Sequence, residues 1–145
     1  MRRDRPPQHE VALTLPGWVS QHVDYDEPYP SDEARIGLVL SLARENERLG
    51  TGAPSAAAVF EAGTGRLVAV GVESVRRLNN STAHAALLAL QFAERRLVHH
   101  ALAAVGQPAH ELFTSAAPCP MCRAAADGSG VSRLVSAAGG APYDG

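Results

Sequence analysis

Two short stretches constrain this chain more than any other feature of its sequence. His84 lies within Thr82-Ala83-His84-Ala85-Ala86, and two cysteines lie within Pro118-Cys119-Pro120-Met121-Cys122. An imidazole and two thiolates are preferred zinc ligands, and three protein ligands leave the fourth tetrahedral position open, as in catalytic zinc sites. Each stretch lies where a helix is expected to begin, so the three side chains can converge from two neighbouring helices. The sequence therefore predicts a zinc site made by His84, Cys119 and Cys122.

A redox-active pair is the alternative interpretation of the two cysteines, because Cys-x-x-Cys is also the thioredoxin-like spacing. That interpretation leaves His84 without a role and does not account for the Thr-Ala-His stretch. The chain has two cysteines, three positions apart, and no secretion signal, which argues against a structural disulfide. Metal binding is the favoured interpretation.

Composition narrows the possible partners. A chain of 145 residues is long enough for one domain with a substantial core. The net charge is −2, and the 13 basic residues are all arginines scattered along the chain, whereas nucleic-acid-binding proteins usually show a clustered basic patch. No apolar run is long enough for a membrane span, and the charged N-terminus lacks the apolar stretch of a signal peptide. We expect a cytoplasmic protein with neither a membrane nor a nucleic-acid partner.

The order of predicted elements indicates the fold. Residues 1–30 are rich in proline and polar groups, and we predict an N-terminal arm there, followed by a single domain over residues 31–145. In chain order, the predicted elements are a helix from Ser31 to Gly50, a hairpin of strands over 56–60 and 67–72, a polar loop over 73–82, a helix over 83–97, a strand over 111–115, a helix from Cys119 to about 127, a strand over 131–137 and a terminal loop over 139–145. This order predicts a three-layer α/β fold, with a mixed sheet sandwiched by helices.

The motifs resemble those of the zinc-dependent cytidine-deaminase superfamily, whose signature is H-x-E followed by P-C-x-x-C. The resemblance covers roughly residues 56–138. Asn79 to His84 is similar to the N-x-x-T-A-H of the branch that contains guanine, cytosine and tRNA adenosine deaminases. The resemblance implies the cytidine-deaminase-like fold, a zinc cofactor and a substrate-binding role for Asn79. It also implies a homodimer, because members of this branch commonly pair. Relatives usually continue with a further strand and helices, so we expect a partner chain or the arm to cover the sheet edge.

One position departs from the family. Ala86 stands where the family has the Glu that carries protons during deamination, and a methyl group can carry none. A positioned acid–base group typically contributes about 10²–10⁴-fold to the rate, so the chain as written is expected to be nearly inactive. A deliberate Glu→Ala change, made to trap substrate in an otherwise intact site, and a natural non-catalytic pseudoenzyme both explain this. The intact ligand set favours the first.

The sequence thus predicts a zinc aminohydrolase that acts on the C–N bonds of cyclic amidines and releases ammonia. We expect the substrate to be a free nucleobase or a related amino-heterocycle, of the guanine, cytosine or amino-triazine type. The alternatives are a nucleoside deaminase and, in another class, a zinc-bound binding module without catalysis. Asn79 also suits a turn, and we expect Thr82 to cap the following helix rather than contact the substrate.

Overall fold

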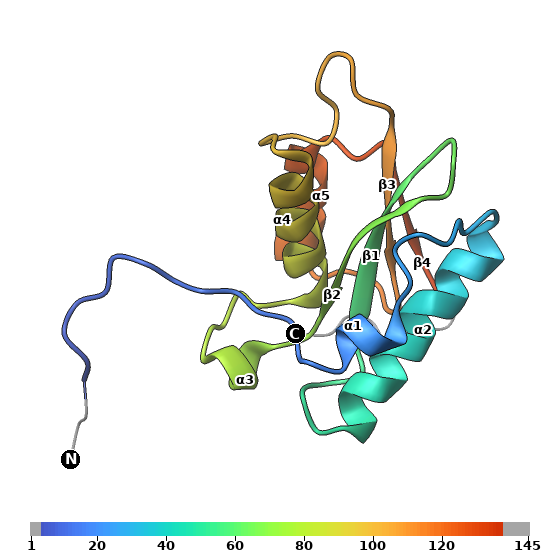
Figure 1. Cartoon of the computed structure of the whole chain (residues 1–145). Coiled ribbons are helices and arrows are strands. Elements are labelled where there is room, and N and C mark those ends of the chain that lie inside the picture. Colours follow the sequence, from blue (N-terminus) through green and yellow to red (C-terminus); the bar gives the residue numbers. More distant parts are fainter. Residues whose placement is uncertain (1–3, 138–145) are drawn as a thin grey trace.

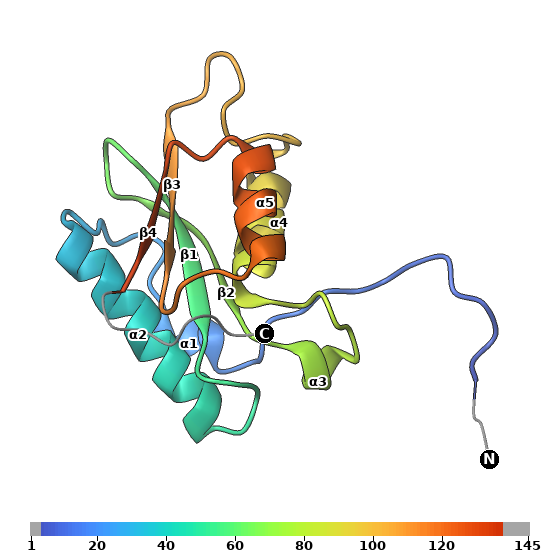
Figure 2. The same ribbon diagram turned by 180° about the vertical axis from the view of Figure 1, so that it is seen from behind.

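The computed structural model describes residues 4–137, and its centre is a four-stranded mixed sheet with helices on both faces (Figure 1, and from behind in Figure 2). The elements are α1 (Val19–His22), α2 (Asp32–Arg48), β1 (Ala56–Glu61), β2 (Leu67–Val72), α3 (Val75–Leu78), α4 (Ala85–Leu97), β3 (His110–Thr114), α5 (Pro120–Ser129) and β4 (Arg133–Ser136). The strand order is β2-β1-β3-β4. β1 is antiparallel to β2 and β3, whereas β3 and β4 are parallel. The predicted three-layer α/β fold is confirmed.

Strand β1 separates two hydrophobic clusters because successive side chains of a strand point to opposite faces. Ala57 and Val59 belong to the cluster beneath α4 and α5. Ala56, Ala58 and Phe60 belong to the cluster beneath α2. Three of these five side chains are alanine, which lets helices approach the sheet closely on both faces.

Helix α2 begins as its sequence predicts. The hydroxyl of Ser31 accepts a hydrogen bond from the N–H of Ala34 at 3.1 Å, and two acidic residues occupy the first turn. Its buried face packs on the sheet together with α1, which the sequence analysis did not predict. Val19 and Val23 of this segment are buried in the same cluster, so the second half of the predicted arm is part of the core.

An ion-pair network ties α2 to the sheet. Arg35 of α2 bonds Glu111 of β3 at 2.9 Å, and the side chains are only 7% and 12% exposed. Arg133 of β4 bridges the same Glu111 at 2.9 Å and Asp32 at 2.6 Å. The network joins the first helix of the domain to the last two strands.

Helix α4 begins at Ala85, two residues later than predicted. The delay has a tertiary cause, because the carbonyl of Ala83 accepts a hydrogen bond from the N–H of Ser74 at 3.0 Å and is held beside the end of β2. The predicted loop over 73–82 contains α3, and the last strand is shorter than predicted. The predicted loop over 139–145 lies outside the described residues. Among the described helices, none is long and apolar enough to cross a membrane.

Candidate metal centre

The three predicted ligands converge. The nearest ligand atoms of His84, Cys119 and Cys122 all lie within 4.8 Å of one another. The Nδ1 atom of His84 is 3.4 Å from Sγ of Cys119 and 3.5 Å from Sγ of Cys122. One metal ion can therefore contact all three residues, as the sequence predicts.

Helix starts position all three ligands. His84 is the N-cap of α4 and has extended backbone angles, φ −78° and ψ 152°. Cys119 is the N-cap of α5, where its sulfur accepts the N–H of Cys122 at 3.5 Å. Pro120 occupies the first turn of α5, a position where its fixed φ is favourable and its missing N–H costs nothing. The N-termini of two helices therefore meet at the ligand cluster.

The donor set fits zinc. Both cysteines are buried, 6% and 1% exposed, whereas His84 is half-buried and closes the cluster on its outer side. Two sulfur donors and one imidazole nitrogen form a soft, tetrahedral type of site that zinc prefers over magnesium or calcium. Within the described residues, no carboxylate belongs to this group.

Ala86 lies in the same hydrophobic cluster as the two cysteines and is 5% exposed. It is in the first turn of α4, two residues after His84. Ala86 therefore packs in the core cluster that contains both cysteines, and its methyl group offers no proton donor or acceptor.

Asn79 is not brought into this cluster. It ends α3 in a left-handed conformation, φ 53°, which asparagine tolerates better than most residues, and it is exposed. This geometry supports the turn role, while its substrate role stays a prediction. The prediction that Thr82 caps α4 is wrong: His84 is the N-cap, and the Thr82 hydroxyl bonds Oδ1 of Asn80 at 2.8 Å.

Sequence reasoning missed the buried carboxylate of Glu73, at the end of β2. It is 7% exposed and accepts hydrogen bonds from the N–H groups of Ala53 and Val75, each at 2.7 Å. Its neighbour Ser74 contacts Ala83, so Glu73 lies close in the fold to the start of α4. An acidic residue directly after an uninterrupted apolar strand is the signal that could have identified it.

The comparisons agree with this site. Residues 30–138 match the model of the cytidine and deoxycytidylate deaminase zinc-binding region. No curated protein sequence matches the chain. The guanine deaminase from Nitrosomonas europaea is 44% identical, with a TM-score of 0.83 over 92% of this chain and 73% of that one. A solved structure in complex with 2,6-diaminopurine is 45% identical, with a TM-score of 0.81 over 88% of this chain and 67% of that one.

More distant structures belong to the same branch. The guanine deaminase from Bacillus subtilis is 30% identical, with a TM-score of 0.67 over 74% of this chain and 64% of that one. A tRNA:A34 deaminase is 28% identical, with a TM-score of 0.62 over 78% of this chain and 84% of that one. The resemblance inferred from the motifs is confirmed. This chain belongs to the family of the cytidine and deoxycytidylate deaminase zinc-binding region.

Proposed function

We propose that the site binds zinc through His84, Cys119 and Cys122 and accepts a free nucleobase or related amino-heterocycle, and that its chemistry is hydrolytic deamination. The observation that carries the proposal is the convergence of these three ligands within 4.8 Å at two helix starts. Guanine is the first candidate substrate, because two of the similar structures are guanine deaminases. Cytosine and amino-triazines follow.

The residues proposed for the site would bind the metal but would not transfer protons. His84 and the two cysteines hold the metal, and a zinc ion in such a site activates water as a nucleophile. Deamination also requires that water lose a proton, that the ring nitrogen gain one and that the amine leave as ammonia. Ala86 supplies none of these transfers, and no described carboxylate joins the ligand group. We therefore propose that the chain as written binds its ligand and turns it over very slowly.

A zinc-bound binding module is the second candidate, and Ala86 is the observation that favours it. Both candidates predict zinc and ligand binding, so binding alone does not separate them. They differ in whether the remainder of the site is still arranged for catalysis. A nucleoside in place of a free base is the alternative within the enzyme class.

Restoring the carboxylate distinguishes these possibilities. In a complete site, Ala86→Glu should raise single-turnover ammonia release from the best base by about 10³-fold, within the range for a positioned acid–base group. Its affinity for the base should change much less, because a proton carrier acts mainly on the transition state. Ala86→Gln is the matched control, since it has the same shape and cannot exchange protons in this way. A zinc-loaded Ala86→Glu protein no faster than Ala86→Gln on any base or nucleoside would leave the binding module as the function.

Three further proposals concern the molecule around the site. Residues 31–145 form the deaminase domain and 1–30 the arm, a division supported by the start of α2 at Asp32, although Val19 and Val23 join the domain core. Asn79 contacts the substrate, supported by its exposure at the end of α3. The protein is cytoplasmic.

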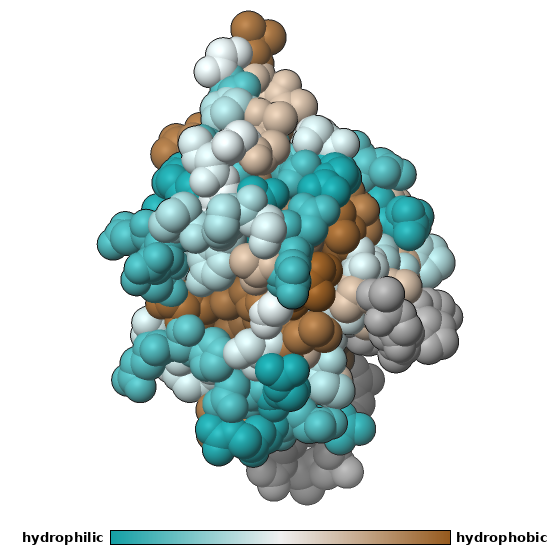
Figure 3. All heavy atoms as spheres, turned by 90° about the vertical axis from the view of Figure 1, so that its right-hand side faces the viewer, coloured by the Kyte–Doolittle hydropathy of each residue, from teal (hydrophilic) through white to brown (hydrophobic). Residues whose placement is uncertain are grey.

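We also propose a homodimer. β4 is an edge strand of the described sheet, and three of its four residues are half-buried. Figure 3 views the side of the molecule that carries α2 and β4, and it shows hydrophobic residues in a band between hydrophilic ones. Unpaired backbone groups on an edge strand readily pair with another chain.

A further inference from the structure

The two edge strands of the described sheet differ in how they are covered. All six residues of β2 are buried, whereas β4 has one exposed and three half-buried residues. An edge strand presents unpaired backbone groups to other chains, and proteins often cover or block such edges. In this fold, contacts from the arm and from α4 cover β2.

The arm covers the start of β2. The N–H of Tyr29 donates to the carbonyl of Gly65 at 2.9 Å, and Pro28 forms an isolated antiparallel bridge with Arg66. Tyr29 packs so closely that a Cβ on Gly65 would overlap its carbonyl oxygen. Proline has no N–H to donate, which confines it to the edges of sheets. The arm therefore seals this end of β2 without adding a strand of its own.

A bulge follows, and a side chain occupies its carbonyls. Leu67 and Ala69 are paired with consecutive residues of β1, so Val68 between them is an extra residue in β2. Bulges twist a strand and interrupt its pairing, and they are frequent at sheet edges. Nη1 of Arg96 donates to the carbonyls of Leu67 and Val68, at 2.9 Å each. Two acceptors of the edge strand are therefore already bonded to a side chain of α4.

Arg96 passes around the edge from one face of the sheet to the other. It belongs to α4, which packs on the cluster that contains Ala57 and Val59. Its guanidinium carbon lies 5.5 Å from the ring centroid of Tyr25, and Tyr25 packs against the opposite cluster, beneath α2. A guanidinium over an aromatic ring is attracted by the ring's quadrupole. Arg96 thus links α4 to the arm around the outside of β2.

A pocket of about 430 Å³ lies beside β2 at this link. Its lining comes from the arm, from α4 and from the strand: Leu15, Tyr25, Val68, Ala69, Val70, Phe92 and Arg96. Among these described residues, Arg96 alone is charged. Removal of its side chain would leave an apolar groove beside a strand with free carbonyls, an arrangement that favours pairing with another strand.

We propose that Arg96 keeps the edge of β2 closed to a second copy of this chain. The occupant of an opened edge would be β2 of that copy, because identical edge strands related by a two-fold axis pair antiparallel in a self-complementary contact. With β2 closed, the open edge of the described sheet is β4, the edge assigned to the proposed homodimer. Arg96 thus determines which edge associates, and this role is independent of the chemistry at the metal centre.

Sedimentation velocity of the zinc-loaded protein tests the proposal at about 10–100 μM, a range in which unpaired strand edges associate. Arg96→Ala should produce species of at least twice the wild-type mass, in amounts that grow with concentration. Arg95→Ala is the matched control and should sediment as the wild type, because it removes the same charge from the adjacent exposed position and does not line the pocket. Hydrogen exchange then locates the contact: peptides from β2 should be more protected in the larger species, and peptides from β4 should not change.

Tyr25→Leu is the second variant, and it decides the question alone if Arg96→Ala does not fold. It removes the ring that Arg96 contacts and keeps an apolar side chain, so the same larger species should form. Circular dichroism and zinc content identify the folded variants. The proposal is overturned if the folded variants keep the wild-type mass, if Arg95→Ala forms the same species, or if protection of β2 does not rise. A monomeric wild type would refute the homodimer and leave this comparison intact.

Discussion

Gly71 of β2 lies directly against the carbonyl oxygen of Ala85, so closely that a Cβ on Gly71 would overlap it. The nearest atoms of the helix are the backbone oxygen of Ala85, one residue beyond His84, and the backbone nitrogen of Ala89. The nearby hydrogen bond from Ser74 to Ala83 holds the same junction together. The position of the first metal ligand is therefore set by how closely α4 approaches the sheet.

Gly71→Ala should destabilise the protein and weaken metal binding together, because the added methyl group pushes the start of α4 off the sheet. We expect a loss of about 1–3 kcal/mol in the free energy of unfolding, as for other overpacked positions. Gly37→Ala is the control, since a Cβ there meets nothing within 4 Å and alanine favours the helix. Urea titrations and zinc competition measure both effects. A Gly71→Ala protein with unchanged zinc affinity would show that this contact does not position His84.

The purified protein should hold about one zinc per chain, because three soft ligands converge on a single point. Cys119→Ser should reduce the zinc content to well below half an equivalent. His100→Ala, on an exposed histidine away from the cluster, should leave it unchanged. Metal analysis after purification without chelators gives the answer, and full zinc occupancy in Cys119→Ser would contradict the ligand assignment.

Removing the charge of Glu111 should lower the free energy of unfolding by about 3 kcal/mol, because the buried guanidinium of Arg35 then lacks its ion-pair partner. The matched control is Glu45→Gln, whose partner Arg48 is 66% exposed, and its effect should stay below about 1 kcal/mol. Urea denaturation compares Glu111→Gln with that control. Equal losses in the two variants would mean that the buried pair adds nothing beyond a surface pair.

The exposed pair of Asp32 and Arg133 should make stability depend on acid pH. The hydrogen bond from Arg133 holds the pKa of the Asp32 carboxyl below its ordinary value of 3.8. A carboxyl whose pKa is lowered by folding stabilises the protein above the unfolded-state pKa, and this contribution is lost as the pH falls through the lower folded-state value. The difference in melting temperature between the wild type and Asp32→Asn should therefore shrink as the pH falls below about 4. A difference that is constant across this range would contradict the assignment.

If the protein is a homodimer, sedimentation equilibrium at micromolar concentration should give twice the mass of one chain. The physical reason is that pairing along the edge strand β4, whose residues are exposed or half-buried, satisfies backbone groups and buries apolar surface together. High salt should not dissociate such an interface. A single species of monomer mass would refute the proposal.

Local sequence was sufficient for the parts of this protein that depend on neighbouring residues. The start of α2 depends on Ser31 and the acidic residues after it, and the start of α5 depends on Cys119 and Pro120. The sequence predicts both helix starts. The ligand set was predictable for the same reason, because N-cap and first-turn positions can be recognised from a few residues. Ala86 is likewise read directly from the sequence, and its effect on catalysis stays a prediction.

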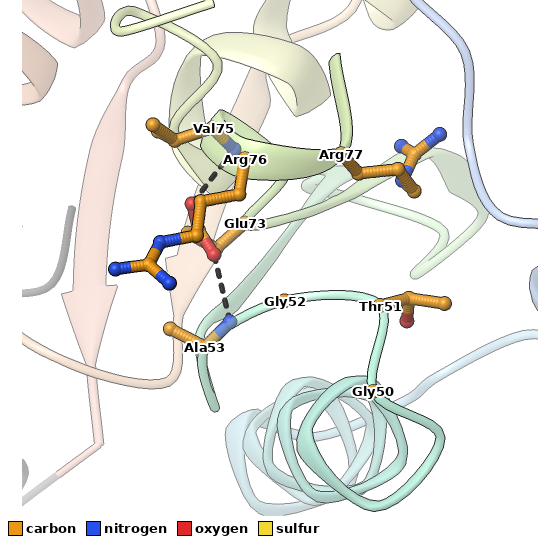
Figure 4. A pocket seen from close by; sticks show the side chains of 8 residues that line it. All are labelled: Gly50, Thr51, Gly52, Ala53, Glu73, Val75, Arg76 and Arg77. Carbon is orange, nitrogen blue, oxygen red and sulfur yellow. Dashed lines mark hydrogen bonds between the residues drawn. The ribbon is translucent and has the colours of Figure 1, made fainter. Parts of the chain in front are cut away.

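The tertiary structure alone decided the remainder. α1 and α3 have four residues each, too few to be stable as isolated helices, and they form only where the fold holds them. The carboxylate of Glu73 accepts a hydrogen bond from the N–H of Ala53, twenty residues away in the chain (Figure 4). The late start of α4 likewise depends on the hydrogen bond that the N–H of Ser74 donates to the carbonyl of Ala83. A sequence pattern records the preferences of adjacent residues, whereas contacts between distant segments exist only once the chain has packed.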